Sequence, residues 1–395
     1  MSKKVLFVAT VVKGHINAFH LPYLKKLKEE GWETHVCAKN DFDIGEDCRI
    51  PYCDRYFDIP FERSPFSSNN LSAYRQLKEI IDKNNYQLVH CHTPVGGALT
   101  RLAAREARNR GTKIIYTAHG YHFYKGASAM MWTVYYPVEK WLASYTDCQI
   151  LINEDDYHIS VNRHFKAERI ELIPGVGVDL KRFSRPDFIL KDQLRTKHGF
   201  NKDDFIMICV GELSESKNQS MLIDVMGHLK ESIPNIKLLL VGRGNKAREF
   251  EEKVQNMNLQ EQVQFMGYRN DVHELMALSD IAVSTSRREG LPVNVMEAMA
   301  VNLPVVVTNS RGNKDLVQHM KNGLVVELDH DKAFSEAVLK LYRSPEMRER
   351  FSIENAKMIK NYSVEEMVNK VCSIYHDYAG SGWISEEGLD ESTVY

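Results

Sequence analysis

Two carboxylates eight residues apart, Glu289 and Glu297, frame the segment of the chain whose residue types are best suited to chemistry. An apolar run over residues 281–285 precedes them and predicts a buried parallel strand. The stretch Gly290-Leu291-Pro292 predicts a loop that turns into a helix, with the proline near its first turn. Glu289 is then expected at the carboxyl edge of the sheet and Glu297 about two turns along the helix. Because N–H groups at a helix start bind anions, the segment suits a nucleotide-sugar.

A lysine is expected at a second helix start. An apolar strand ends at Gly211, and Lys217 follows after a short loop. A cation there meets the positive end of the helix dipole, so it needs an anion, and a diphosphate is the natural candidate. A further strand-glycine turn, Gly242-Arg243-Gly244, is only a partial dinucleotide fingerprint. We interpret it as a nucleotide-facing loop, with a plain tight turn as the alternative.

Histidines and acids that could bind a metal stand apart in the sequence. His90 and His92 alternate along a predicted strand and share one face, but a metal site needs further ligands and none stands at fixed spacing. The triplet Asp41-Phe42-Asp43 has the form of a metal-binding D-x-D, yet it lies in a polar stretch where an acid-rich turn is favoured. We therefore predict that catalysis requires neither a metal nor another cofactor.

Strand-like and helix-like segments alternate along the chain, which predicts an α/β fold with two Rossmann-like, doubly wound parallel sheets. The strands are expected at 4–10, 34–38, 88–91, 114–117, 149–153, 205–210, 237–241, 263–265, 281–285, 304–308 and 324–327. Helices include 15–30, 72–84 and 95–109. We expect domains at 1–185 and 186–362, a helix over 363–379 that packs back on the first domain, and a loose tail over 380–395.

Composition narrows the class of protein. The 395 residues carry a net charge of -2, which gives no general attraction to nucleic acid. No secretory signal or membrane-spanning run is visible, and the seven scattered cysteines suit reduced thiols, so we expect a cytoplasmic protein. Residues 123–137 are rich in methionine and aromatic side chains. They suit either a membrane-water boundary, as a lipid-linked substrate would need, or ordinary helix packing.

The stretch 286–300, which contains the E-x7-E pattern of Glu289 and Glu297, resembles retaining glycosyltransferases of family 4. Those enzymes have two Rossmann-like domains facing across a cleft, the GT-B type. The likeness extends from the first strand to the C-terminal helix. The stretches 11–22, 116–120 and 136–141 are similar to bacterial exopolysaccharide and capsule enzymes of the EpsD type.

The resemblance implies roles for individual residues. It places three residues near the reacting sugar and its leaving diphosphate: His119, Glu289 and Lys217. It implies a donor site made of loops, cations and the E-x7-E segment: Gly14, Gly211, Glu212, Lys217, Arg243, Tyr268, Arg269, Gly290, Leu291, Pro292 and Glu297. It implies an acceptor side with His15, Tyr121 and His122. Glu212 departs from the family pattern, which usually has arginine there, and the loop at Gly14 has one glycine where two are common.

The implied activity is transfer of a sugar, with retention, from a nucleotide-sugar, UDP-sugars being favoured. Glu289 would hold sugar hydroxyls, Glu297 would hold ribose hydroxyls, and the leaving phosphate would take the acceptor proton. The acceptor would be a saccharide or a polyprenyl-linked saccharide, with peripheral contact to the inner face of the cell membrane. Two alternatives remain, a UDP-GlcNAc 2-epimerase of the same fold and a non-catalytic partner in a polysaccharide assembly complex.

Overall fold

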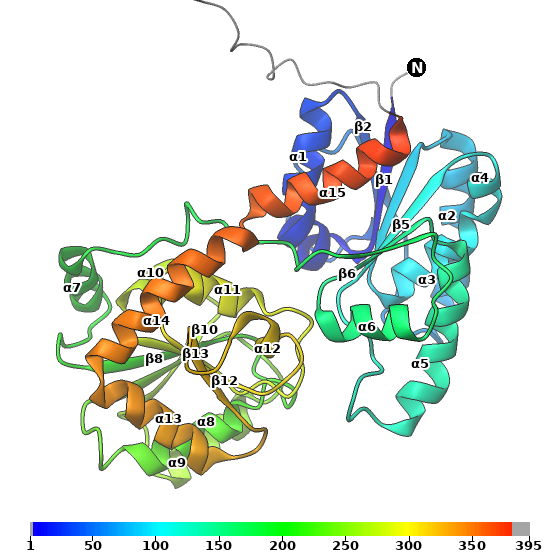
Figure 1. Cartoon of the computed structure of the whole chain (residues 1–395). Helices are drawn as coiled ribbons and strands as arrows, with labels where there is room; N and C mark the ends of the chain where they lie inside the picture. The colour runs from blue at the N-terminus through cyan, green and yellow to red at the C-terminus, as the bar shows by residue number, and fades with distance from the viewer. Residues whose placement is uncertain (1–2, 381–395) are drawn as a thin grey trace, which may run out of the picture. The chain divides into compact units, whose positions relative to one another are not determined.

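The computed structural model describes residues 3–380, which form two compact units (Figure 1). The first unit contains, of the described residues, 3–151, Tyr157–Ile173 and 367–380. The second contains Ile152–Asp156 and Pro174–Glu366. Each unit is built on one parallel sheet with helical connections, which confirms the predicted α/β class with two doubly wound domains.

The sheet of the first unit has seven strands in the order β3-β2-β1-β4-β5-β6-β7. Their bounds are β1 Lys4–Val11, β2 Glu33–Lys39, β3 Arg55–Asp58, β4 Leu88–His92, β5 Lys113–Ala118, β6 Cys148–Leu151 and β7 Arg169–Leu172. All five residues of β4 are buried, as expected for a central parallel strand. The strand order reverses between β1 and β4, so the carboxyl ends of these two strands form the switch point where open α/β sheets bind ligands.

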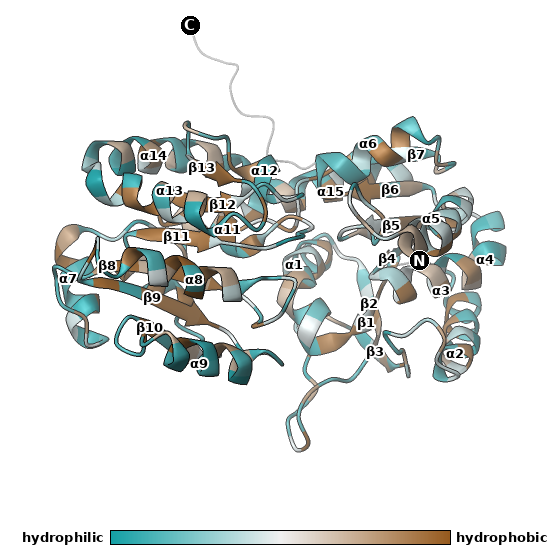
Figure 2. Ribbon diagram, turned by 90° about the horizontal axis from the view of Figure 1, so that it is seen from below, coloured by the Kyte–Doolittle hydropathy of each residue, from teal (hydrophilic) through white to brown (hydrophobic). Residues whose placement is uncertain are grey.

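The sheet of the second unit has six strands in the order β10-β9-β8-β11-β12-β13. Their bounds are β8 Phe205–Val210, β9 Ile236–Val241, β10 Val263–Gly267, β11 Ile281–Ser284, β12 Val305–Thr308 and β13 Gly323–Val326. Here the switch point lies between β8 and β11. Figure 2 shows the strands of both sheets as mainly hydrophobic and the helices as mixed, because each helix buries only one face.

Helices connect the strands in both units. Before residue 173 they are η1 Val12–His20, α1 Leu21–Glu29, α2 Asn69–Asn84, α3 Pro94–Ala103, α4 Arg105–Asn109, α5 Ala129–Leu142, η2 Ala143–Tyr145 and α6 Glu154–Asn162. After it they are α7 Phe188–Lys197, α8 Gln219–Leu229, α9 Ala247–Asn256, α10 Val272–Leu278, α11 Val293–Ala300, α12 Asn313–Leu316, α13 Asp331–Arg343, α14 Pro345–Met358, η3 Ile359–Tyr362 and α15 Val364–Ala379. Within the described residues, none of these helices has the length and apolar character needed to cross a membrane.

The C-terminal helix α15 packs on the first unit. The Tyr375 hydroxyl shares a hydrogen bond of 2.5 Å with His90 Nδ1, and both side chains are buried. His376 Nε2 lies 2.8 Å from a carboxylate oxygen of Glu30. A helix at the end of the chain therefore completes the core of the N-terminal sheet. Of the tail expected over 380–395, residues 381–395 lie outside the described residues.

Some elements differ from those expected from the sequence. Strands β3 and β7 were missed because they lie at the edges of the sheet, where half-exposed residues do not form an apolar run. The helix expected over 15–30 begins earlier and has two parts, the π-helix η1 followed by α1. The helix expected over 95–109 is divided at Ala104 into α3 and α4.

Candidate active site

Lys217 and Glu289 meet at the switch point of the second sheet. Lys217 follows β8 and Glu289 follows β11, and these strands are neighbours. Lys217 Nζ lies 2.5 Å from Glu289 Oε1. The side chains are only 25% and 10% exposed, respectively, so the pair is largely shielded from water. The anion that the lysine was expected to need is thus, in this structure, the Glu289 carboxylate.

The loop that carries Glu289 is held through its backbone. Arg311 Nε donates a hydrogen bond to the Glu289 carbonyl oxygen at 3.0 Å. Gly312 lies behind the loop with φ of +79°, and a Cβ atom there would lie 2.6 Å from the Gly290 carbonyl oxygen. Only glycine fits this close approach, so backbone packing fixes the position of Glu289.

Helix α11 begins directly after this loop, with Pro292 at its N-cap and Leu291 buried before it. The first N–H groups of a helix have no intrahelical acceptor, so α11 offers donors beside Gly290. Asn294 Nδ2 donates to the Val210 carbonyl oxygen at 2.6 Å, which ties the helix start to the end of β8. Because the helix begins at Val293, Glu297 lies about one turn along it. The prediction that Glu297 lies about two turns along the helix was wrong.

Glu297 is an unusual carboxylate. Burial raises the pKa of its carboxyl group from 4.5 to about 7, and the opposing effect of the Arg182 charge is smaller. A charged Glu297 therefore carries a desolvation cost in the folded protein at neutral and alkaline pH.

We expect Glu297→Gln to raise the free energy of unfolding by roughly 2–3 kcal/mol at pH 8, and by less than about 1 kcal/mol at pH 5. The folded-state pKa lies above the unfolded value, so the favourable contribution of this acid is full below about pH 4.5 and is lost as the pH rises to about 7. Urea unfolding at both pH values measures the difference. Glu336→Gln, on an exposed position of α13, is the matched control. Equal stability of Glu297→Gln and wild type at pH 8 would contradict the burial argument.

The loop after β8 packs tightly on the loop after β9. A Cβ atom at Gly242 would lie 2.0 Å from the Gly211 carbonyl oxygen, and one at Gly244 would lie 2.1 Å from the Leu213 carbonyl oxygen. Both glycines are therefore required by close backbone contact, as in a tight turn. The Arg243 side chain between them remains exposed at the end of the sheet.

Glu212, the departure from the family pattern, points into solvent. Its side chain is exposed, whereas its carbonyl oxygen accepts a hydrogen bond from Gln219 Nε2 at 2.8 Å. Further along the same sheet edge, Tyr268 follows β10 and is 68% exposed. The neighbouring Arg269 makes two hydrogen bonds to Asp271, at 2.7 and 2.5 Å. Tyr268 thus offers a ring face suited to stacking on a base, while the Arg269 side chain is paired with the Asp271 carboxylate.

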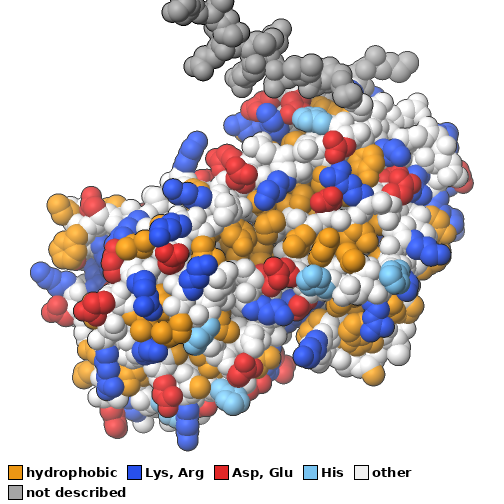
Figure 3. Space-filling view, viewed as in Figure 1, with side chains coloured by type: hydrophobic (Ala, Val, Ile, Leu, Met, Phe, Trp, Pro, Cys, Tyr) orange, Lys and Arg blue, Asp and Glu red, His pale blue; other side chains and the backbone are white. Residues whose placement is uncertain are grey.

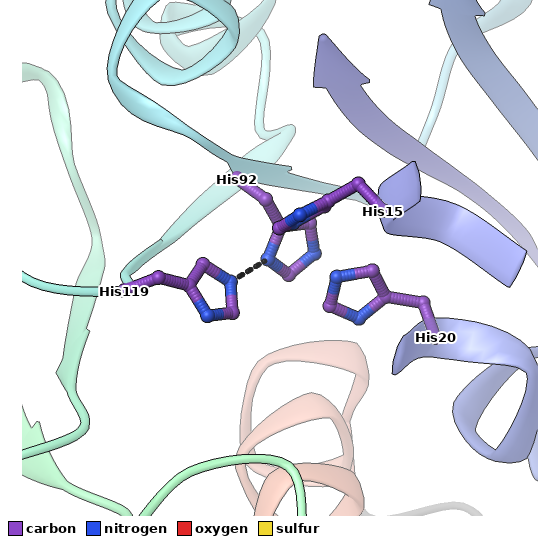
Figure 4. A group of neighbouring side chains, drawn as sticks. All are labelled: His15, His20, His92 and His119. Atoms are coloured by element: carbon purple, nitrogen blue, oxygen red, sulfur yellow. Dashed lines mark hydrogen bonds between the residues drawn. The ribbon is translucent and has the colours of Figure 1, made fainter. Parts of the chain in front are cut away.

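Four histidines gather at the switch point of the first sheet (Figure 4). His92 ends β4, His119 follows β5, and His15 and His20 lie on η1, directly after β1. His119 Nε2 lies 3.4 Å from His92 Nδ1. Burial lowers the pKa of all four imidazoles, that of His119 to about 4. The fold therefore brings His15, His20 and His119 next to His92, although their spacing in the sequence does not indicate this.

The loop at Gly14 is held by the acids of the D-x-D triplet. Asp41 accepts hydrogen bonds from the backbone N–H groups of Lys13 and Gly14, at 2.5 and 3.0 Å. Asp43 lies 3.2 Å from the Lys13 side-chain nitrogen. These acids thus have partners within the chain.

A mainly apolar cavity of about 580 Å³ opens beside this loop, within the first unit. Its apolar lining includes Val11, Phe66, Leu99, Val134, Tyr135 and Val138. Its polar lining includes His15, Arg63, His122 and Glu139. His122 stacks on Tyr135 with 4.7 Å between ring centroids. Tyr121 is instead a packing residue, 3% exposed and hydrogen-bonded to Ser160 and Gln149.

Two residues of this region, His20 and Thr93, were not predicted from the sequence. Thr93 lines the cavity with φ of +63°, and its hydroxyl shares a hydrogen bond of 2.7 Å with that of Thr10. This backbone conformation is unfavourable for a β-branched residue and costs about 1–3 kcal/mol, and such strain gathers at functional sites. For His20, the only sequence signal was its spacing of five residues from His15.

Comparisons with known proteins identify the family to which the chain belongs. The family described as Glycosyl transferases group 1 matches residues 191–358, and the family described as Glycosyl transferase 4-like matches residues 4–153. EpsD of Bacillus subtilis, named as a glycosyltransferase, is 43% identical over 378 residues, which cover 96% of this chain and 97% of EpsD. The chain therefore belongs to the group 1 glycosyltransferases, and the expected likeness to EpsD-type enzymes is confirmed.

Two further proteins extend the comparison. The UDP-Gal:α-D-GlcNAc-diphosphoundecaprenol α-1,3-galactosyltransferase of Escherichia coli is 28% identical over 361 residues, 87% of this chain and 92% of that enzyme. HepE of Anabaena, solved with UDP and glucose, superposes with a TM-score of 0.78 at 18% identity, covering 94% of this chain and 99% of HepE. The latter likeness shows the fold, which is the expected GT-B type.

Proposed function

We propose that the chain transfers a sugar from a UDP-sugar, with retention at the anomeric carbon, to a saccharide carried on a polyprenyl diphosphate. The reaction serves extracellular or capsular polysaccharide synthesis and needs neither metal nor cofactor. The observation that carries the proposal is the shielded Lys217–Glu289 pair beside the start of α11. In this account residues 1–185 form the acceptor side and residues 186–362 hold the donor.

When the donor binds, its diphosphate replaces the Glu289 carboxylate as the ion-pair partner of Lys217. Glu289 then loses its cation and accepts hydrogen bonds from sugar hydroxyls, while Glu297 accepts them from the ribose. In the reaction the bond from the anomeric carbon to the phosphate oxygen breaks, and a bond to the acceptor oxygen forms on the same face. The acceptor proton passes to the departing phosphate. Lys217 and the N–H groups at the start of α11 stabilise the charge on that leaving group.

UDP is favoured as the carrier nucleotide for two reasons. HepE was solved with UDP and glucose, and the name of the Escherichia coli enzyme specifies UDP-galactose. The α linkage in that name is also why retention is part of the proposal. We assign His119 to contact with the sugar, and Arg243 and Tyr268 to the nucleotide. The exposed Glu212 can turn away from the diphosphate, so it does not conflict with donor binding.

The cavity of the first unit supports a lipid-linked acceptor. Arg63 provides a cation for a diphosphate at a cavity that is otherwise mainly apolar. Beside it, α5 carries exposed apolar residues on one helical face: Met130, Val134, Val138 and Trp141. Figure 3 shows hydrophobic side chains among the surface atoms of this region, at lower right. We therefore place the enzyme in the cytoplasm, in peripheral contact with the inner face of the membrane.

The double substitution Val134→Glu and Val138→Glu is expected to weaken binding to vesicles that carry a polyprenyl-diphosphate saccharide by at least about tenfold. Val134 and Val138 are 43% and 45% exposed, so burying the rest of each side chain contributes about half of the roughly 1.5–3 kcal/mol of full burial, and 1.4 kcal/mol corresponds to tenfold. Vesicle co-sedimentation measures the change. Val161→Glu, on α6 and 40% exposed, is the control because it lies outside the cavity lining. An equal loss in both variants would count against a lipid-facing α5.

A transfer assay tests the proposed function. The protein is incubated with UDP-glucose, UDP-galactose or UDP-GlcNAc, with and without a polyprenyl-diphosphate saccharide, and the product linkage is assigned by proton NMR. The proposal predicts an α-linked product that requires the acceptor and forms equally well with EDTA. Conversion of UDP-GlcNAc without acceptor would identify an epimerase. No turnover with any donor would favour the non-catalytic alternative, and a β-linked product would contradict retention.

A further inference from the structure

We propose that His15, His20, His92 and His119 form a binding site for one divalent transition-metal ion of the zinc class. One nitrogen from each residue can be chosen so that all four lie within 4.8 Å of one another. Figure 4 shows the four side chains grouped together, with His119 and His20 on either side of His92 and His15 in this view. They come from η1, the end of β4 and the residue after β5, all in the first unit.

The π-helical form of η1 brings two of the four rings together. His15 and His20 are five residues apart, and at 3.6 residues per turn an α-helix would turn them about 140° away from each other. The i→i+5 hydrogen bonding of a π-helix brings residues five apart onto the same side. Their ring centroids lie 5.0 Å apart, and His20 stacks on His92 at 3.8 Å. π-helical segments are rare and frequently occur at functional sites.

Several nitrogens in the group lack a partner. Within residues 3–380, no hydrogen-bond partner is present for either ring nitrogen of His20, for His92 Nε2 or for His15 Nε2. His20 and His92 are 2% and 1% exposed. A buried polar group without a partner costs about 1–3 kcal/mol. A coordinated ion would satisfy one of the two His20 nitrogens.

The donor set selects the class of ion. The four ligands are imidazoles with no carboxylate among them, which suits Zn²⁺, Ni²⁺ or Cu²⁺ and not Mg²⁺ or Ca²⁺. Ligand nitrogens about 2.0–2.1 Å from a tetrahedral ion lie about 3.3–3.4 Å apart. His119 and His92 already have this separation, at 3.4 Å, and the other rings need shifts of roughly 1 Å.

If the chain has the proposed function, a metal ion in this site would inhibit sugar transfer. An ion held by His15 and His119 would remove both imidazoles from contact with acceptor and sugar. Zn²⁺ is therefore expected to inhibit transfer reversibly, with activity restored by EDTA. The cluster would act as an inhibitory metal site in an enzyme whose catalysis does not use a metal.

Calorimetric titration of Zn²⁺ into metal-free protein tests the site. Wild type is expected to bind one ion per chain, and His20→Leu to bind it at least about tenfold more weakly. Leucine removes two unpartnered nitrogens from a buried position and should preserve the fold. His158→Leu is the matched control, since His158 is an exposed histidine on α6 of the same unit. As a second measurement, Co²⁺ bound to wild type should show the visible absorption of a tetrahedral site and be displaced by Zn²⁺.

Each possible result of these titrations supports or overturns the proposed metal site. Absence of Zn²⁺ binding by wild type, an unchanged affinity in His20→Leu, or an octahedral Co²⁺ spectrum would overturn it. Zn²⁺ binding by a protein that transfers no sugar from any UDP-sugar would support the metal site and contradict the proposed function. In an active enzyme, His20→Leu should require at least about tenfold more Zn²⁺ for half-inhibition than wild type does.

Discussion

Lys217→Ala is expected to lower kcat for sugar transfer by about 10²–10³-fold, the loss typical when one group that stabilises developing negative charge is removed. The lysine ammonium is the cation that we assign to the leaving diphosphate. Its removal also leaves the largely buried Glu289 carboxylate without its ion-pair partner, so donor binding should weaken as well. Initial rates over a range of donor concentrations separate the two effects. The proton NMR assay of product measures them.

The control for this experiment is Lys202→Ala. Lys202 lies in the same unit, is exposed, and accepts a hydrogen bond from Arg195 through its backbone carbonyl oxygen, so loss of its side-chain charge should leave kcat unchanged. A similar fall in both variants would indicate a general effect of net charge. A Lys217→Ala enzyme with the wild-type kcat would show that the diphosphate charge is stabilised elsewhere.

Arg101→Met should lower the free energy of unfolding by about 3–5 kcal/mol, because it leaves one partner of a buried ion pair uncompensated. Arg101 is completely buried, its Nη2 lies 2.9 Å from Glu139 Oε2, and its Nε donates to the Gly97 carbonyl oxygen at 3.0 Å. Its guanidinium also lies 3.9 Å from the centre of the Tyr116 ring. The pair joins α3 to α5 behind the proposed acceptor cavity, so vesicle binding should fall together with stability.

Urea unfolding measures the effect of Arg101→Met. The matched control is Arg105→Met, because Arg105 is exposed at the start of α4 and should change stability by less than about 1 kcal/mol. The double variant Arg101→Met and Glu139→Leu removes both charges and should regain most of the lost stability. If the double variant is as unstable as the single one, packing and not charge accounts for the loss.

The central strands and the donor segment were predictable from local sequence. Residues 205–210 and 281–285 form apolar runs, and these correspond to β8 and β11, the strands on either side of the second switch point. Pro292 marked the start of α11 to within one residue. These signals are local, because burial on both faces of a parallel strand requires continuous apolar residues.

The side-chain pairs of the site could not be predicted in this way. Lys217 and Glu289 are 72 residues apart, and their contact depends on β8 and β11 being neighbours, which no local spacing encodes. No further ligand for His92 could be found from sequence spacing, because its neighbours come from η1 and from the residue after β5. The stretch that forms η1 has an ordinary amphipathic pattern. Its π-helical form, which aligns His15 with His20, therefore could not be predicted from the sequence.

The most direct test of the central claim is calorimetric titration of UDP-, GDP- and ADP-sugars into wild type and into Lys217→Ala, with and without EDTA. Binding of UDP-sugars alone to wild type, unaffected by EDTA and at least about tenfold weaker in Lys217→Ala, is the predicted result, since one charged hydrogen bond contributes about 1.5–3 kcal/mol. Equal affinity of the wild type and Lys217→Ala for every donor would contradict a diphosphate site at Lys217.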